Sequence, residues 1–75
     1  MKIYTVYFIN DSRGICRIIG KGRNYKQANK IIHKFLNFKN YKSHYWRTWR
    51  PDYDDTTWID VGSWSEIFCI KKEVI

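Results

Sequence analysis

The first fifty residues contain one acidic side chain, Asp11, against twelve of the chain's fourteen Lys and Arg residues, which gives this part a net charge of +11. Residues 51–75 contain two basic and six acidic side chains, a net charge of −4, and the whole chain carries +7. Because burying an unpaired charge is costly, the excess positive charge has to lie on the surface. Such a surface attracts polyanions or acidic partner surfaces and argues against mimicry of DNA, which needs an acidic surface.

Cysteine and long apolar runs are also scarce. Cys16 and Cys69 are too few for a disulfide framework and do not have the spacing of a metal site. Two isolated thiols are typical of a protein in the reducing cytosol. No segment reaches the roughly 18 apolar residues of a membrane span, and the apolar residues 1–9 lack the cleavage site of a signal peptide. We therefore expect a cytoplasmic protein that does not contact a membrane.

Side chains that support catalysis form no recognisable group. The carboxylates outside the basic half that could serve hydrolysis or bind a metal are Asp52, Asp54, Asp55, Asp60 and Glu66. The first three follow Pro51 in a polar turn, where Asp is expected for local hydrogen bonds. His33 and His44 have no evident orienting carboxylate, and the sequence contains no phosphate-binding loop. We expect a protein without catalytic activity, cofactor or metal.

Aromatic residues, by contrast, are abundant: four Trp, six Tyr and four Phe make up 19% of the chain. A chain of this length forms a single domain, residues 1–75, that buries only about 60% of its unfolded surface. Each buried aromatic removes roughly 150–250 Å² from water, so a few of them can form the core. The others are expected on the surface among Arg and Lys, as in a stacking or hot-spot surface.

The pattern of apolar residues predicts five strands and one helix. Strands at 2–9 and 15–19 form a hairpin around the loop 10–14, and the glycines in 20–23 end the second strand. Further strands are predicted at 44–49, 56–61 and 66–71. The order ββαβββ indicates an α+β fold, with a single antiparallel sheet of four to five strands and one helix packed on one face. One helix cannot cover both faces, so the other face or its rim is expected to be solvated.

The helix is predicted at residues 25–39, with Asn24 as N-cap and Gln27 completing a capping box. At 100° per residue one face of this helix is apolar and carries Ala28, Ile31, Ile32, Phe35 and Phe38. The opposite face is polar and carries Lys26, Lys30, His33, Lys34 and Asn37.

Three lysines form the first candidate binding surface. Lys26, Lys30 and Lys34 are spaced at i, i+4 on a helix that contains no acidic residue. Like charges at this spacing destabilise a helix by a few tenths of a kcal/mol each, a cost that a role in binding polyanions explains. The alternative is an ordinary solvated helix face.

The second candidate is the segment 41–50, which holds four aromatic and three cationic side chains. Strand alternation places Tyr45, Arg47 and Trp49 on one face, and His44, Trp46 and Thr48 on the other. With the adjacent Arg50, the first face could stack nucleobases while a cation meets phosphate. Alternatively, Arg47 packs between aromatic rings as a structural cation–π group.

The stretch from Trp58 to Phe68, preceded by Tyr45-Trp46-Arg47, resembles a pattern in small uncharacterised proteins of phages and prophages of low-GC Gram-positive bacteria. The resemblance covers about the C-terminal half and implies no defined activity or site. The alternative for its core at 60–63 is that this segment specifies a hairpin turn. Phage accessory proteins of this size commonly inhibit or modulate host and defence machinery, and anti-CRISPR proteins are among them.

Two functions follow as expectations. The first is a non-catalytic phage-type binding protein of the host cytoplasm that inhibits or modulates a nucleic-acid-handling host or defence complex, as an anti-CRISPR protein does. Its partner would be a protein component of that complex, DNA or RNA, or both. The alternative is a free-standing nucleic-acid-binding module that uses a basic, aromatic-rich surface. A homodimer through an exposed sheet edge remains open.

Overall fold

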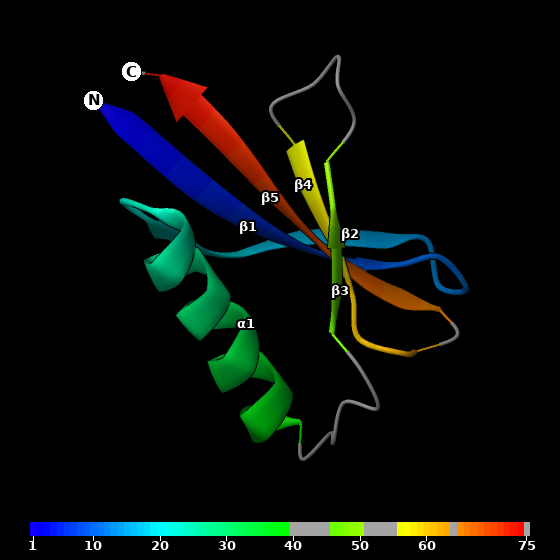
Figure 1. The fold of residues 1–75 in the computed structure, drawn as a ribbon. Helices are drawn as coiled ribbons and strands as arrows, with labels where there is room; N and C mark the ends of the chain where they lie inside the picture. Colours follow the sequence, from blue (N-terminus) through cyan, green and yellow to red (C-terminus); the bar gives the residue numbers. More distant parts are fainter. Residues whose placement is uncertain (40–45, 51–55, 64, 75) are drawn as a thin grey trace.

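In the part of the chain that the structure describes, five antiparallel strands form one sheet and one helix lies across one of its faces (Figure 1). The computed structural model describes residues 1–39, 46–50, 56–63 and 65–74. The elements are β1 (Lys2–Asn10), β2 (Ile15–Gly22), α1 (Tyr25–Phe38), β3 (Arg47–Trp49), β4 (Thr56–Asp60) and β5 (Glu66–Val74). The strands are ordered β2-β1-β5-β4-β3 across the sheet. The predicted α+β fold and the order ββαβββ are therefore confirmed.

The centre of the sheet is the pair β1 and β5, which are nine residues long each. They pair in register along their whole length, from Lys2 opposite Val74 to Asn10 opposite Glu66. Both strands are rich in β-branched and aromatic residues, which suit a pleated and half-buried surface. The described ends of the chain consequently lie side by side at one end of the sheet (Figure 1).

The core lies between this sheet and α1. Val6 and Ile32 are fully buried, and Ile59, Phe68 and Ile70 are 1% exposed. These side chains come from β1, α1, β4 and β5, so each of these elements contributes to one continuous cluster. Aromatic rings extend it, because the Phe8 centroid lies 4.9 Å from that of Phe35 on the helix and 5.6 Å from that of Phe68.

Strand β2 is longer than predicted, and the predicted break at residues 20–23 was wrong. The strand continues through Gly20 and ends at Gly22, and a bulge shifts its register opposite Val6 and Tyr7. The glycines lie in the strand because α1 passes directly over it. A β-carbon on Gly20 would lie 2.9 Å from Ile31 Cγ2, and one on Gly22 would lie 2.9 Å from Gln27 Cβ.

Helix α1 begins as predicted, and its cap is confirmed. The Asn24 side chain accepts a 2.8 Å hydrogen bond from Gln27 N, and the Gln27 side chain accepts one of the same length from Arg23 N. None of the helices in the described ranges is long and apolar enough to cross a membrane.

The buried stripe of α1 differs from the prediction at its C-terminal end. Phe38 was expected to face the core but is 90% exposed, whereas Leu36 is buried. The stripe follows Ala28, Ile32 and Leu36, four residues apart. At 100° per residue Phe38 lies about 120° around the helix from Ile32, which points it away from the sheet.

The third predicted strand begins later in the described residues than predicted. Of the described part of 44–49, Arg47–Trp49 is a strand and Trp46 is not. Trp46 is half-buried and packs against the core. The predicted positions at His44 and Tyr45 and the predicted turn at 51–55 lie outside the described residues. The predicted strands at 56–61 and 66–71 correspond to β4 and β5, and β5 extends three residues further.

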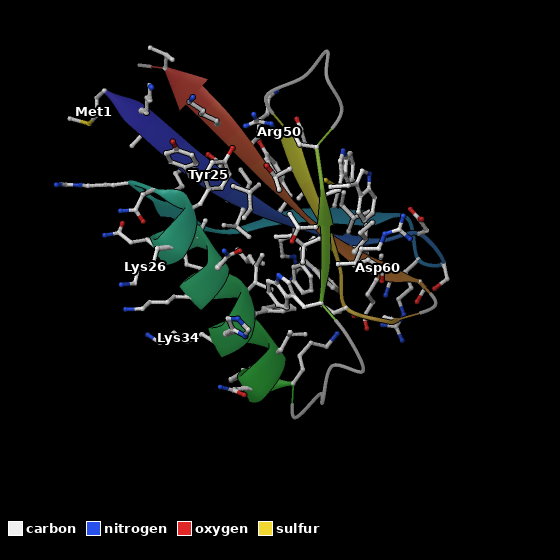
Figure 2. All side chains as sticks on the ribbon, in the orientation of Figure 1. Met1, Tyr25, Lys26, Lys34, Arg50 and Asp60 are labelled. Carbon is white, nitrogen blue, oxygen red and sulfur yellow. The ribbon has the colours of Figure 1, made fainter. Side chains whose placement is uncertain are left out.

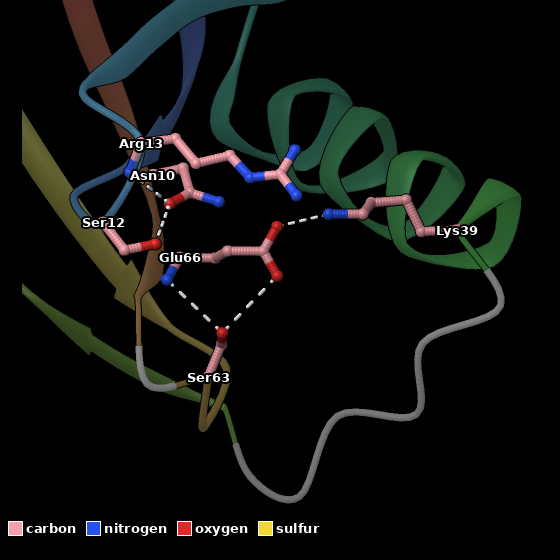
Figure 3. A network of polar contacts seen from close by, with 6 residues as sticks. All are labelled: Asn10, Ser12, Arg13, Lys39, Ser63 and Glu66. Atoms are coloured by element: carbon pink, nitrogen blue, oxygen red, sulfur yellow. Dashed lines mark hydrogen bonds and ion pairs between the residues drawn. The ribbon is translucent and has the colours of Figure 1, made fainter.

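A polar network joins the helix C-terminus to the turns at one end of the sheet (Figure 3). Lys39 Nζ forms an ion pair with Glu66 Oε2. Ser63 Oγ accepts a 3.3 Å hydrogen bond from Glu66 N and donates a 3.5 Å bond to Glu66 Oε1. Next to them, Asn10 Oδ1 accepts hydrogen bonds from Ser12 Oγ and Arg13 N within the β1–β2 turn.

Candidate functional site

The face of the sheet opposite α1, called here the open face, carries a row of apolar and aromatic side chains. One residue from each strand contributes, and neighbours in the row are register partners: Ile18, Tyr7, Cys69, Trp58 and Trp49. Because paired residues in adjacent strands project to the same side, the five form one line across the sheet. Alternation explains the direction, since Val6, Phe8 and Phe68 point into the core on the other side.

Accessibility in this row is highest at its two ends. Ile18 is 52% exposed and Trp49 is 38% exposed, while Tyr7 and Trp58 are half-buried. Cys69 is buried between the two half-buried aromatics. From Trp49 to Tyr7 the row crosses three inter-strand steps of about 4.8 Å, a distance of about 14 Å. The row is therefore wide enough to meet more than one planar group.

Cationic side chains lie on both sides of this row. Lys71 of β5 and Lys21 of β2 both pair with Thr5 of β1, and both lysines are exposed. On the other side, Arg47 lies at the β3 position opposite Asp60. The alternation also places Asp60 and Glu73 on this face, so the positive charge is partly offset there. Asp60 Oδ1 accepts a 2.9 Å hydrogen bond from Gly62 N, which orients that carboxylate toward its own turn.

Arg47 and Trp49 share the open face as predicted. The guanidinium carbon of Arg47 lies 5.5 Å from the centroid of the Trp49 ring. This is the structural cation–π arrangement that the sequence left as an alternative, and it also presents a cation beside an exposed ring. Tyr45, the third residue predicted on this face, lies outside the described residues.

Trp46 and Thr48 point to the helix side, which confirms the predicted alternation. The Trp46 ring stacks on the His33 ring with centroids 4.5 Å apart and an interplanar angle of 14°. Thr48 lines a hollow of about 310 Å³ beside Tyr25 and Ile70. His33, predicted on the solvated side of the helix, thus helps to hold the edge of the sheet against α1.

Arg50 directly follows Trp49, but its guanidinium takes part in this helix-side arrangement instead of lying in the aromatic row. Its Nη1 atom donates a 3.3 Å hydrogen bond to Tyr25 Oη, which also accepts a 3.4 Å bond from Thr57 Oγ1. The structure therefore separates Arg50 from Arg47 and Trp49, with which the sequence grouped it.

The three predicted helix lysines form a separate surface. Lys26, Lys30 and Lys34 are all exposed, and Figure 2 shows Lys26 and Lys34 extending from α1 on the side away from the sheet. Since α1 covers one face of the sheet, these lysines cannot meet the same flat ligand as the open-face row. The predicted site residues thus divide between the helix and the two sides of β3.

Sequence reasoning missed the central residues of the open-face row. Tyr7 precedes Trp58 by 51 residues and Cys69 by 62 residues in the sequence. Only the register of β1, β5 and β4 brings the three together. The alternation of each strand was visible in the sequence, but the strand order was not. No local signal indicated that Tyr7 and Trp58 would be separated by one residue of β5.

The described residues contain no cluster of three or more His, Cys, Asp or Glu side chains that could hold a metal ion. The two cysteines differ in environment, since Cys16 is exposed and Cys69 is buried. Comparison of the chain with protein-family models, curated proteins and solved structures finds no match. The resemblance to phage proteins therefore stays a prediction, and function has to be argued from the surface.

Proposed function

We propose that the protein is a non-catalytic binding protein that holds a single-stranded segment of nucleic acid on the open face of its sheet. The observation that carries this proposal is the row from Trp49 through Trp58 to Tyr7, which lies across three neighbouring strand pairs. Aromatic side chains on an exposed surface stack with bases irrespective of sequence, at about 1–3 kcal/mol per base. Lys21, Lys71 and Arg47 beside the row supply cations for the backbone phosphates.

A single strand fits this surface better than a duplex does. Stacking on a protein ring needs a base that is not already stacked between its neighbours, as in a single strand or a loop. The open face presents rings in a line, and the one helix of the described residues, α1, lies on the other face, so this face has no described helix to insert into a major groove. The overall charge of +7 adds a field that draws any polyanion toward the protein.

The inhibitor function implied by the phage resemblance remains a second proposal. It is favoured by exposed apolar side chains outside the row, since Phe38 is 90% exposed on the helix. Exposed aromatic and apolar side chains are also enriched at the centres of protein contacts. A protein that binds both a nucleic acid and a protein component would obstruct a nucleic-acid-handling complex without catalysis.

Titration of the protein with oligodeoxythymidylate tests the nucleic-acid proposal, with Trp fluorescence as the readout. We expect quenching that saturates, and a weaker interaction with a duplex of equal phosphate content. Chemical-shift changes in a ¹⁵N-labelled sample should concentrate on β1, β3, β4 and β5, including the indole N–H signals of Trp49 and Trp58. Equal or tighter binding of the duplex, or shifts confined to α1, would contradict the proposal.

A further inference from the structure

The helix and the edge strand β2 border a groove that shares only Lys21 with the nucleic-acid proposal. Two adjoining hollows, of about 390 and 450 Å³, share Ile31 and Lys34 and thus form one depression along α1. Its floor is apolar and its rim is cationic. We propose that this groove binds an acidic peptide segment with apolar anchor residues, contributed by a partner protein.

The apolar floor comes from residues that the core leaves uncovered. Ile19, Ile31 and Phe35 are packed against the core but only partly buried. Phe38 lies at the end of this floor and is 90% exposed. A large apolar side chain that is almost completely exposed lowers the solubility of the folded protein and does not stabilise the fold. Contact with an apolar group of a partner would remove this surface from water.

The rim determines the charge of the occupant. Lys30 and Lys34 come from α1, and Lys21 comes from β2 on the opposite side of the groove. Helix α1 contains no acidic residue that would neutralise them. Three cations around an apolar floor are complementary to a segment in which Asp or Glu residues alternate with Leu, Phe or similar residues. The phosphates of a nucleic acid would pair with the lysines of the rim, but they would make no contact with the apolar floor.

The edge position of β2 makes the groove accessible to a chain segment. Among the described strands, β2 pairs only with β1, so its outer edge faces away from the other four strands. Helix packing over Gly20 and Gly22 holds α1 close to this edge and fixes the distance between the two rims. The groove is therefore formed by rigid elements, which reduces the ordering cost of binding.

A fluorescein-labelled synthetic peptide of alternating Glu with Leu and Phe is a suitable probe, and fluorescence anisotropy measures its affinity at constant salt. We expect Phe38→Ala and Lys30→Glu each to weaken binding about tenfold. Lys2→Glu is the matched control, since it makes the same charge change at an exposed residue of β1 outside the groove. It should alter the affinity less than about twofold. A second peptide with Ala in place of Leu and Phe should bind at least about tenfold more weakly.

Five outcomes would overturn the proposal. Absence of peptide binding would remove the site, and equal losses in Lys30→Glu and Lys2→Glu would reduce it to general charge attraction. Equal binding of the Ala peptide would show that the apolar floor has no role. Displacement of the peptide by oligodeoxythymidylate, with the same sensitivity to Lys30→Glu, would make the groove a nucleic-acid site. Sedimentation of the unliganded protein completes the test, because a dimer lost in Phe38→Ala would make a second copy the occupant.

Discussion

The backbone of Gly20 lies so close to Ile31 that a β-carbon on this glycine would stand 2.9 Å from Ile31 Cγ2 and 3.0 Å from Ile31 Cδ1. Both distances are shorter than ordinary van der Waals contact. The close approach lets α1 cover the outer strand β2 as well as the central strands. It also sets the width of the groove between them, so one glycine links the packing of the core to the shape of a proposed binding surface.

Substitution of this glycine tests the contact. We expect Gly20→Ala to lower the free energy of unfolding by about 1–3 kcal/mol, because the added methyl group overpacks the interface. In an Ile31→Ala background the same substitution should cost less, since the atoms that it meets are gone. Urea denaturation of the four proteins of this double-mutant cycle measures the coupling. Additive effects would show that the helix does not approach β2 this closely.

The register of the helix gives a second prediction. Ile32→Ala should cost about 2–5 kcal/mol, because Ile32 is fully buried against β1 and β5. Phe38→Ala removes more atoms but should change stability by no more than about 0.5 kcal/mol, since Phe38 is 90% exposed. Thermal melts of both variants provide the comparison. If Phe38→Ala lowered stability more than Ile32→Ala, Phe38 would face the core, as the sequence alone predicted.

The ion pair of Lys39 and Glu66 gives a third prediction. Lys39 Nζ also lies 4.8 Å from the centroid of the Phe8 ring, so the lysine closes the end of the core. Both side chains are partly exposed, at 37% and 21%, and solvent weakens their attraction. A double-mutant cycle of Lys39→Met and Glu66→Gln should give a coupling of about 0.2–1 kcal/mol. This coupling should shrink as salt is raised, and a salt-independent value would point to packing instead.

The sequence predicted which helices and strands form better than it predicted the residues at which they begin and end. Helix α1 was recognisable because capping by Asn24 and the periodicity of Ala28 and Ile32 are local signals. The end of β2 was not recognisable, because glycine can end a strand and can also allow a helix to pack closely over one. Only the packing of Ile31 against Gly20 shows that the second role applies here. The misplacement of Phe38 has a different origin, since the apolar character of a residue does not reveal where the buried stripe of the helix is centred, and Phe38 lies about 120° around the helix from Ile32.

The candidate site was predictable only in part. Arg47 and Trp49 were identified because aromatic and cationic residues alternate within a single short segment. Tyr7 and Trp58 could not be joined to them, because strand order depends on pairings between the two ends of the chain. Arg50 was grouped with Trp49 by proximity in sequence, whereas the structure directs its guanidinium to Tyr25 on the helix side.

The last prediction separates the open face from the helix lysines as the surface that binds nucleic acid. Each cation–phosphate contact with a single strand makes the slope of log affinity against log salt steeper by about 0.7. If the open face binds, changing Lys21 and Lys71 together to Gln should flatten that slope by about 1.4. Trp49→Ala should weaken binding by about 1–3 kcal/mol with little change in slope, because stacking releases no counterions.

The matched comparison is the variant with Lys26, Lys30 and Lys34 all changed to Gln. These residues lie on α1, away from the row of Trp49 and Tyr7, so their loss should weaken binding only through the reduced overall charge. Oligodeoxythymidylate titrations at several salt concentrations measure all three variants. A slope that flattens by about 2 in the helix variant, and stays unchanged when Lys21 and Lys71 are replaced, would transfer the nucleic-acid site from the open face to the helix.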